Sequence, residues 1–358
     1  MTSAVLGQLA CGLVLGTAFT IMSGIAQAAP VGPALERPAL MVKAPQRVVL
    51  LDMELAGSRI VAVGERGVII LSDDQGESWH QAPVPVSTEL TALSFVDERN
   101  GWAVGHAGVV LATRDAGETW SKQFDGRQAA QVMLKAAQES GDKRAQKEAE
   151  WLVADGPDKP FLDVHFRDAQ HGMIVGAYGL AFATADGGAT WMSIADRLDN
   201  PGALHLYALS MRHDEVLVAG EQGLVLHSAD RGRSFEALQL PYEGSFFTAA
   251  LPPNGEMIVA GLRGNALRSK DGGISWSSLE VPGNISANFN SSAVDASGSV
   301  WLVNAAGMVF KLGNNGLELA KKRLRPLNDL LFLESGSALG LSFSGVVSVP
   351  LVSQGAKQ

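Results

Sequence analysis

Thr113-Arg-Asp115-Ala-Gly117-Glu-Thr-Trp120 is one of five copies of a short phrase that recurs along the chain with fixed internal spacing. Each copy has Asp two residues after Ser or Thr, Gly two residues later, and Trp or Phe three residues after that glycine. In every copy the Asp also stands seven residues after a glycine that closes a Gly-x-x-Gly turn. A repeat this regular indicates a fold built from one repeated unit. The copies are Ser72–Trp79, Thr113–Trp120, Thr184–Trp191, Ser228–Phe235 and Ser269–Trp276.

The spacing of the turn glycines sets the length of the unit. Gly67 and Gly108 lie 41 residues apart. Around Gly108 the apolar runs Thr91–Val96, Trp102–Val104 and Val109–Thr113 are separated by turn residues and predict three strands. The residues that follow the phrase predict a weaker fourth strand. Units of roughly 40 residues with four strands each are typical of propeller blades.

Two further units are degenerate. In the sixth, Gly307 is the turn glycine, Asn314 replaces the Asp and Leu319 replaces the aromatic residue. The seventh survives around Gly345, close to the end of the chain. The sequence therefore predicts an all-β, seven-bladed β-propeller. Ala39–Lys43 is predicted to supply the missing fourth strand of the seventh blade and to close the ring, which would hide open sheet edges. The alternatives are an open ring or a six-bladed one.

Each fixed position of the phrase has an architectural explanation. The carboxylate can accept hydrogen bonds from the backbone N–H groups of its turn, and the glycine permits a positive φ. The aromatic ring is predicted to pack between neighbouring blades, and its loss to alanine to cost on the order of 3–5 kcal/mol. Loss of the Asp is predicted to cost about 0.5–2 kcal/mol. These structural residues are Asp74, Trp79, Asp115, Trp120, Asp186, Trp191, Asp230, Phe235, Asp271 and Trp276.

The phrase resembles the Asp-box, or BNR repeat, of sialidases and of many non-enzymatic propellers. The longer phrases Phe95–Gly105 and Phe166–Gly176 resemble the photosystem II stability/assembly factor-like family of propellers, and the resemblance covers residues 47–350. It implies a non-enzymatic assembly factor that holds membrane-protein intermediates outside the cytoplasm. It also implies, for members in other bacteria, companions of envelope transport systems, including RND-type exporters. The expected partner is therefore a membrane or envelope protein complex.

The N-terminus predicts export. Residues 1–28 carry no charged side chain, and an apolar run is followed by Ala26-Gln27-Ala28, an A-x-A cleavage signature. We interpret 1–28 as a signal peptide of a periplasmic protein, 29–46 as an N-terminal segment and 47–358 as the propeller; the alternative is a retained membrane anchor. Cys11, the single cysteine, lies in this segment, so disulfide chemistry is not expected. The net charge of −9 argues against a nucleic-acid partner.

One interval is too long for the repeat. Gly108 and Gly179 are 71 residues apart, and the excess at 125–160 is rich in helix formers. The sequence predicts a helical hairpin between blades 2 and 3, with Asp142 capping the second helix. Its chain direction places it on the face of the Gly-x-x-Gly turns, where it would overhang the usual binding face as a lid or docking arm; the alternative is a tolerated surface excursion. Its contact candidates are Val132, Met133, Trp151 and Leu152.

The variable residues of the Gly-x-x-Gly turns are the candidate binding site. They should surround the channel opening, and they differ between blades whereas the scaffold positions repeat. The alternative is that exposed turn positions simply vary. No cofactor or metal is expected, because the histidines are scattered without ligand spacing. The binding candidates are Glu65, Arg66, His106, Tyr178, Glu221, Gln222 and Arg263.

A sialidase-like glycoside hydrolase is the alternative function. Such enzymes use an arginine cluster, a Tyr nucleophile assisted by Glu, and an Asp acid/base. The Phe-Arg-Ile-Pro motif of their first blade is absent here, and the available tyrosines are Tyr178, Tyr207 and Tyr242. Arg66 and Arg263 could contribute charge, but a third convergent arginine is not evident. The sequence therefore favours a non-enzymatic, protein-binding assembly or accessory factor for a membrane or envelope complex, with no catalytic residue assigned.

Overall fold

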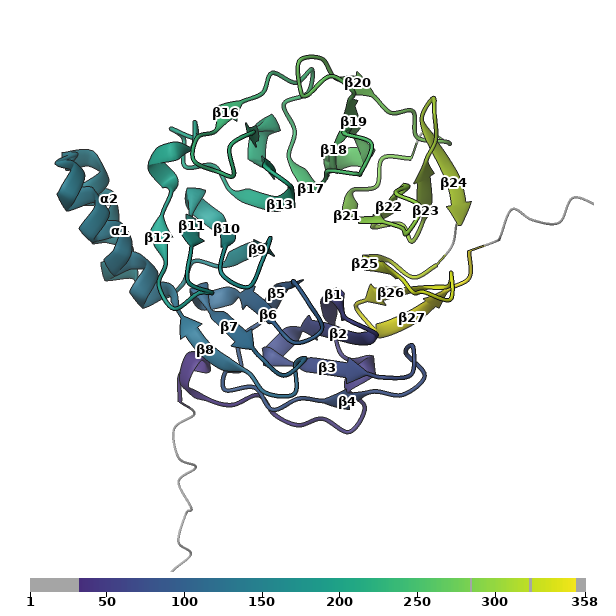
Figure 1. Ribbon diagram of the computed structural model, residues 1–358, viewed down its shortest axis with the longest axis horizontal. Helices are drawn as coiled ribbons and strands as arrows, with labels where there is room; N and C mark the ends of the chain where they lie inside the picture. The colour runs from purple at the N-terminus through teal and green to yellow at the C-terminus, as the bar shows by residue number, and fades with distance from the viewer. Residues whose placement is uncertain (1–31, 284, 322–323, 352–358) are drawn as a thin grey trace, which may run out of the picture. The chain divides into compact units, whose positions relative to one another are not determined.

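The repeated turns organise the chain into seven antiparallel sheets arranged around a ring (Figure 1). The computed structural model describes residues 32–283, 285–321 and 324–351. Within these residues six sheets have four strands and one has three, each running in sequence order from the inside of the ring outward. We number the sheets as blades 1 to 7 along the chain. The predicted β-propeller with a helical insertion is therefore confirmed, whereas the predicted signal peptide lies outside the described residues.

The blades have the following strands. Blades 1 to 3 contain β1 Leu50–Ala56, β2 Arg59–Gly64, β3 Ile69–Ser72, β4 His80–Gln81; β5 Leu90–Phe95, β6 Gly101–Gly105, β7 Val110–Thr113, β8 Ser121–Phe124; β9 Phe161–Phe166, β10 Gly172–Gly176, β11 Ala181–Thr184, β12 Met192–Ser193. Blades 4 and 5 contain β13 Leu206–Arg212, β14 Glu215–Gly220, β15 Val225–Ser228, β16 Glu236–Ala237; β17 Phe246–Ala250, β18 Met257–Gly261, β19 Ala266–Ser269, β20 Ser277–Ser278. Blades 6 and 7 contain β21 Phe289–Val294, β22 Val300–Asn304, β23 Val309–Leu312, β24 Leu317–Lys321; β25 Leu327–Phe332, β26 Ala338–Ser342, β27 Gly345–Val349.

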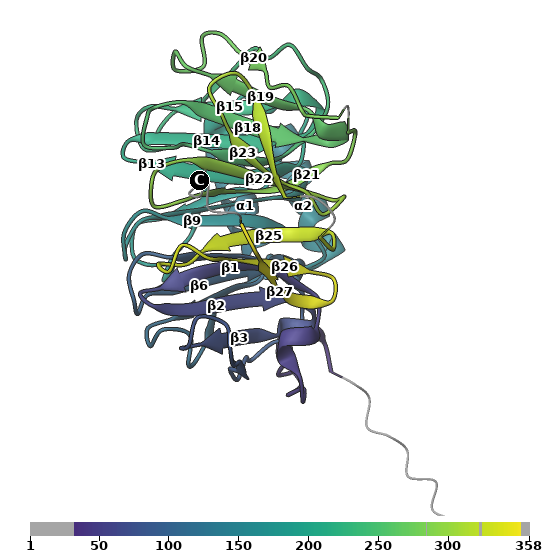
Figure 2. The ribbon, with the colours of Figure 1, turned by 90° about the vertical axis from the view of Figure 1, so that its right-hand side faces the viewer.

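The strands run along the ring axis, so their connections lie on two opposite faces (Figure 2). In an up-and-down sheet the connection between the second and third strands lies on the same face as the connection to the next blade. The Gly-x-x-Gly turns connect the second and third strands of their blades and so lie together on one face, which we call the turn face. The Asp-box turns join the third and fourth strands and lie on the opposite face. The Asp-box carboxylates are therefore spread around one face and do not gather in a cleft.

The Asp-box of blade 2 shows the hydrogen bonds that the repeat encodes. The Asp115 carboxylate accepts from the backbone N–H of Thr119 at 2.9 Å, and from the hydroxyls of Thr119 at 2.6 Å and Thr113 at 2.7 Å. The Gly117 N–H donates to the Thr113 hydroxyl at 3.0 Å, and the Trp120 indole donates to the Gly117 carbonyl at 2.9 Å. The box therefore satisfies the polar groups of its own turn, which is an architectural role.

The aromatic residues of the boxes fill the gaps between blades. Trp120 is buried in a cluster with Val61 and Leu71 of blade 1. Gly117 faces the same blade so closely that a Cβ would lie 3.0 Å from the Leu71 side chain. Burial of an indole between two sheets is a large apolar contribution to stability. The core of this fold is thus a series of interblade layers rather than one central mass.

The ring closes without the strand that the sequence predicts for this purpose. The Met53 N–H in β1 donates to the Asp329 carboxylate in β25 at 3.1 Å, and the Asn328 amide donates to the Leu50 carbonyl at 2.8 Å. Blade 7 has three strands in the described residues, and Ala39–Lys43 does not join it. This segment lies beside blade 1, where the Gln81 side chain accepts from the Val42 N–H at 2.9 Å. The prediction of a closing strand from 39–43 is therefore wrong, because blade 1 offers these backbone groups their partners.

The insertion forms the predicted helical hairpin. Helix α1 spans Gly126–Ser140 and α2 spans Lys143–Asp155, with Asp125 and Asp142 as the respective N-caps. The hairpin starts on the turn face, where Gly126 abuts Gly108, and then lies against the outer strands of blades 2 and 3 (Figure 1). The predicted overhang of the binding face is therefore wrong, because the hairpin packs its apolar side chains on the hydrophobic cluster between blades 2 and 3. Among the described residues, no helix has the length and hydropathy needed to span a membrane.

Candidate functional site

The Gly-x-x-Gly turns share one backbone conformation. Their third position has a positive φ close to 57°, as at Arg66 (56°), Tyr178 (57°) and Arg263 (57°). The residue before it donates its N–H to the carbonyl that precedes the first strand, as Glu221 does to His205 at 2.9 Å. A left-handed conformation is uncommon for residues other than glycine, and its recurrence here shows that the surrounding bonds impose it. The turn thus presents a different side chain from the same backbone in each blade.

The seven binding candidates lie on the turn face but are distributed over several blades and do not form a single cluster. Arg66 belongs to blade 1 and Arg263 to blade 5, across the ring from each other (Figure 1). The Arg66 side chain is 83% exposed. His106 faces Glu89 at 3.4 Å between a ring nitrogen and a carboxylate oxygen. The structure therefore does not bring the two arginines of the glycosidase hypothesis together.

Blades 3 and 4 do bring candidates together, and we call this group the blade 3–4 cluster: Lys159, Tyr178, His205 and Glu221. The Tyr178 and His205 rings lie 4.8 Å apart between centroids, and the Lys159 ammonium lies 5.0 Å from the centre of the Tyr178 ring. A Glu221 carboxylate oxygen lies 3.5 Å from Nδ1 of His205. Tyr178 is 56% exposed, which makes this cluster a polar and aromatic contact surface.

Sequence reasoning finds Tyr178 and Glu221 but misses Lys159 and His205. His205 could have been found from its position in the repeat, directly before the first strand of blade 4. The residue directly before each first strand bonds the turn of its own blade, as Glu89 does with His106 at 2.9 Å and His205 with Glu221 at 2.9 Å. Residues at this position therefore neighbour the variable turn positions in every blade.

A second polar site lies in the central channel, which the sequence does not predict. It is a cavity of about 230 Å³ lined by the first strands of all seven blades. Three of its carboxylates accept backbone N–H groups of the next blade: Asp52 from Leu93, Glu54 from Phe95 and Asp163 from Leu209, each at 2.6 Å. The fourth, Asp329, bonds Met53 across the closure of the ring. These carboxylates connect neighbouring blades.

Burial changes the protonation of the channel residues. Burial raises the pKa of Glu54 to about 8 and that of Asp163 to about 7. Burial, followed by the charge of Asp329, raises the pKa of Asp52, while burial lowers the pKa of His165 to about 4. The direction is that expected when charged groups leave water. Among the described residues, no group of His, Cys, Asp or Glu has the arrangement of a metal site.

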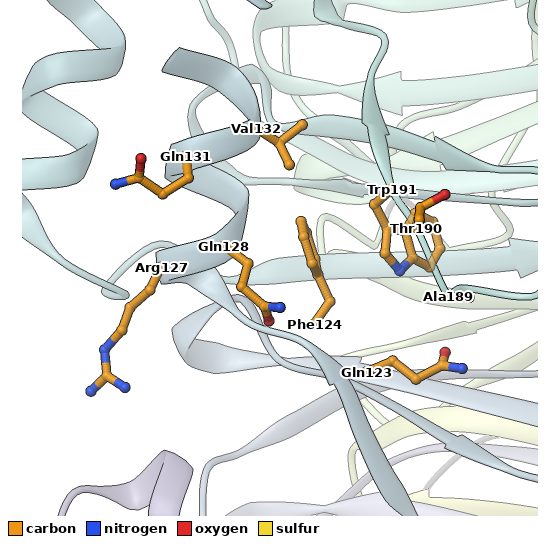
Figure 3. Close-up of a pocket in the computed structure, with 9 residues that line it drawn as sticks. All are labelled: Gln123, Phe124, Arg127, Gln128, Gln131, Val132, Ala189, Thr190 and Trp191. Carbon is orange, nitrogen blue, oxygen red and sulfur yellow. The ribbon is translucent and has the colours of Figure 1, made fainter. Parts of the chain in front are cut away.

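A third site is a pocket of about 530 Å³ between α1 and blade 3, which we call the hairpin pocket (Figure 3). The Phe124 and Trp191 rings form its apolar part, and α1 covers it from outside. Three glutamines and one arginine supply most of its polar groups. The lining residues are Gln123, Phe124, Arg127, Gln128, Gln131, Val132, Ala189, Thr190 and Trp191.

Trp191 departs from the hydrogen bonding of the other boxes. The indole N–H of Trp79, Trp120 and Trp276 donates to the box glycine of the same turn at 2.9–3.1 Å. The buried Nε1 of Trp191 has no hydrogen-bond partner in the described part of the chain, and neither has the buried Oε1 of Gln123. An unsatisfied buried donor or acceptor costs about 1–3 kcal/mol. The break in the repeat therefore coincides with the pocket that the insertion creates.

The insertion candidates are mostly turned toward the propeller. Val132, Met133 and Leu152 are half-buried and pack on the hydrophobic cluster between blades 2 and 3. Trp151 is 57% exposed, and the Lys147 ammonium lies 5.0 Å from the centre of its ring. The helical period alone could not show which face the hairpin buries. Of the four candidates, Trp151 alone presents a largely exposed side chain.

Fold and repeat together define a β-propeller whose Asp-boxes are structural. A family model described as "Photosynthesis system II assembly factor YCF48" matches residues 71–143 and 143–244. Over residues 71–244 the chain is therefore similar to a photosystem II assembly factor-like family of β-propellers. A curated relative, "Photosystem II assembly lipoprotein Ycf48" of Synechococcus sp. (strain CC9902), is 35% identical over 92 residues, which are 25% of this chain and 28% of that protein.

Solved structures share the fold at low sequence identity. "YCF48 bound to D1 peptide" is 18% identical with a TM-score of 0.63, over 87% of this chain and 97% of that one. A Niastella koreensis GH74 enzyme is 13% identical with a TM-score of 0.62, over 87% of this chain but 53% of that one. At these identities the likeness shows the fold alone. The family match therefore favours a non-enzymatic protein over a glycosidase.

Proposed function

We propose that this chain is an exported, non-enzymatic assembly or accessory factor that binds an exposed segment of a membrane or envelope protein complex on its turn face. The observation that carries the proposal is the identical backbone of the Gly-x-x-Gly turns, which present side chains that differ from blade to blade. The family match and the peptide-bound YCF48 support it. An RND-type transporter as the partner stays a prediction from the sequence.

The blade 3–4 cluster is the centre of the proposed binding surface. It offers an exposed phenol ring, a lysine over that ring, and an imidazole beside a carboxylate. Aromatic side chains that keep a polar tip are enriched in protein interfaces, because they bury apolar area and still form hydrogen bonds. Arg66 and Arg263 extend the surface with positive charge at its periphery and would govern the rate and salt dependence of binding.

A photo-crosslinker at Tyr178 tests this proposal. With p-benzoylphenylalanine at position 178, we expect crosslinks to one defined membrane protein in detergent-solubilised membranes of the source organism, identified by mass spectrometry. The same residue at Ile274, which is 87% exposed in an Asp-box turn on the opposite face, is the matched control. Equal products from both positions, or no membrane protein at position 178, would contradict the proposal. Reversal of Arg66 and Arg263 to Glu should weaken the capture.

The glycosidase alternative predicts a different result. We expect no release of 4-methylumbelliferone from its sialoside above the rate without protein, because Arg66 and Arg263 lie in blades 1 and 5 and cannot clamp one carboxylate. A commercial sialidase serves as the positive control. Turnover that disappears in Tyr178→Phe would establish the enzyme and refute the non-enzymatic proposal.

A further inference from the structure

We propose that the outer edge of β27 in blade 7 binds an extended segment of a partner protein, which pairs with it as a fourth strand. Blade 7 has three strands in the described residues, whereas each of the other six blades has four (Figure 1). An uncovered strand edge presents N–H and C=O groups that can pair with another chain. The complete blades show which kind of segment this position takes.

Complete blades hold their fourth strand by a recurring hydrogen bond. In blades 1, 3, 4 and 5 the apolar residue after the short fourth strand donates its N–H to the first carbonyl of the third strand, at 2.8–3.0 Å. Its side chain enters the layer shared with the next blade, as Leu279 does in the cluster with Phe289 and Phe310 of blade 6. The donor and acceptor residues are Ala82 and Ile69, Ile194 and Ala181, Leu238 and Val225, and Leu279 and Ala266.

The corresponding acceptor in blade 7 is the Val346 carbonyl. Leu341 in β26 pairs with Val346, as Val63 in β2 pairs with Ile69. Because alternate residues of an antiparallel strand face the same side, the N–H and C=O of Ser348 point outward together with those of Val346. Within residues 32–283, 285–321 and 324–351, no strand pairs with this edge. Blade 7 therefore has the backbone groups that would hold a fourth strand.

The exposure of β27 agrees with a missing neighbour. The third strands of blades 1, 2, 4 and 5 are buried along their whole length. In β27, by contrast, Val346 and Val347 are half-buried and Ser348 is exposed. Val346 lies in the hydrophobic cluster between blades 7 and 1, which contains Leu50 and Leu341. An aliphatic side chain beside Val346 would therefore extend an existing apolar layer.

The segment of this chain that the repeat would place at this edge is held elsewhere. Ala39–Lys43 precedes β1 at the spacing at which other fourth strands precede the next blade, but its Ala39 N–H donates to the Val84 carbonyl of blade 1 at 3.0 Å. Just upstream, Leu35 is buried in the cluster between blades 1 and 2, and the Arg37 side chain donates to the Ser87 hydroxyl at 3.0 Å. A move to blade 7 would break these contacts, so the edge is left for a segment of another protein.

The open edge is short, and this limits the ligand. The turn Pro45–Arg47 abuts Gly345 and closes the end of the edge toward the turn face. The fourth strands of complete blades are equally short, and in blade 5 this part of the sequence is Ser277-Ser278-Leu279. The expected ligand is therefore an extended segment with an aliphatic residue preceded by two small or polar residues. The inference rests on the proposed function insofar as the ligand is a protein segment, but it assigns that segment to a surface outside the turn face.

Backbone ¹⁵N–¹H spectra of the full chain test the inference. The probe is N-acetyl-Trp-Ser-Ser-Leu-amide, which copies Trp276–Leu279 of blade 5. We expect a saturable downfield shift of the Ser348 amide resonance, assigned by its absence in Ser348→Pro. A probe with N-methyl-leucine cannot donate to the Val346 carbonyl and should bind about three- to tenfold more weakly.

Matched controls separate strand pairing from non-specific contact. Ser348→Pro removes an outward N–H of the open edge and should weaken binding by a similar factor. Ser278→Pro removes an outward N–H of the complete blade 5 and should leave the affinity unchanged. An unmoved Ser348 resonance at any attainable concentration, or equal affinities for the methylated and unmethylated probes, would overturn the proposal. The methylated probe needs no change in the protein and covers the case in which Ser348→Pro does not fold.

The tail of the chain is the competing occupant. Protein that ends at Leu351 should bind the probe with the affinity of the full chain. A rise in affinity of about tenfold or more would show that residues 352–358 compete for the edge, and it would refute a partner segment as the ligand.

The two proposals fail separately. If the probe leaves Ser348 unmoved while crosslinking at Tyr178 still captures a membrane protein, only the binding edge of blade 7 is refuted. If the probe binds but crosslinking at Tyr178 captures nothing, the turn-face function is refuted and the edge of β27 becomes the contact surface.

Discussion

Replacement of Trp102 by alanine is expected to lower the free energy of unfolding by about 3–5 kcal/mol. The indole is fully buried between blades 2 and 3 and stacks on Phe166 with the ring centroids 3.5 Å apart. Its N–H donates to the Gly187 carbonyl at 3.1 Å, and the Arg114 guanidinium lies 4.7 Å from its ring centre. Truncation therefore removes apolar contacts, a hydrogen bond and a cation–π contact together.

Circular dichroism during chemical unfolding measures this effect. Trp151→Ala removes the same side chain from an exposed helix position and should change stability by no more than about 0.5 kcal/mol. Trp102→Phe keeps most of the stack and loses the hydrogen bond, so an intermediate loss is expected. Equal losses from Trp102→Ala and Trp151→Ala would show that the interblade layers do not carry the stability of the ring.

Stability is expected to fall as the pH rises from about 4.5 to 8, and Glu54→Gln should remove much of this fall. Burial raises the pKa of Glu54 from 4.5 to about 8 in the folded chain. The folded state therefore keeps a proton that the unfolded state releases above pH 4.5. The stability that this proton contributes decreases as the pH rises from 4.5 and is fully lost above about 8. The loss for this one group is roughly 2–5 kcal/mol.

The other channel residues with shifted pKa values affect stability over pH ranges that differ from that of Glu54. Burial lowers the pKa of His165 from 6.5 to about 4, so the contribution of this residue to stability increases with pH, but only up to its ordinary pKa of 6.5. Asp163, with a pKa raised to about 7, contributes in the same direction as Glu54 and retains part of the slope in the variant. Glutamine still offers an oxygen to the Phe95 N–H, so the variant should match the wild type near pH 5.

Unfolding curves at several pH values provide the measurement. At pH 9 Glu54→Gln should exceed the wild type in stability, whereas Glu77→Gln, an exposed residue of the first Asp-box, should follow the wild type throughout. Parallel pH profiles for the wild type and Glu54→Gln would contradict the assignment of a buried, protonated carboxyl in the channel.

The repeat made the fold predictable and left the sites largely hidden. Asp115 and Trp120 stand at fixed spacings, so their turn and their packing follow from local chemistry. The contacts that close the ring cannot be inferred from local sequence. Met53 and Asp329 are 276 positions apart, and no nearby residue marks them as partners. The burial of Glu54 depends in the same way on the strands of all seven blades.

The hairpin pocket illustrates the same limit. Helix-forming composition and Asp142 predicted both helices, but the face that α1 buries depends on the neighbouring blade. The free indole N–H of Trp191 looks identical to that of Trp120 in the sequence, because the two phrases have the same form. Only the tertiary arrangement shows that Trp120 is paired and that Trp191 has no partner among the residues the structure describes.

The closing seam between β1 and β25 has a consequence for biosynthesis. Its bonds join residues near the start of the propeller to residues near its end, so the seam forms only after nearly the whole chain has left the ribosome. Until then the apolar side of blade 1 that packs against blade 7 stays exposed. Nascent propellers are therefore expected to need protection by chaperones late in synthesis, when six blades are complete and the circle is still open.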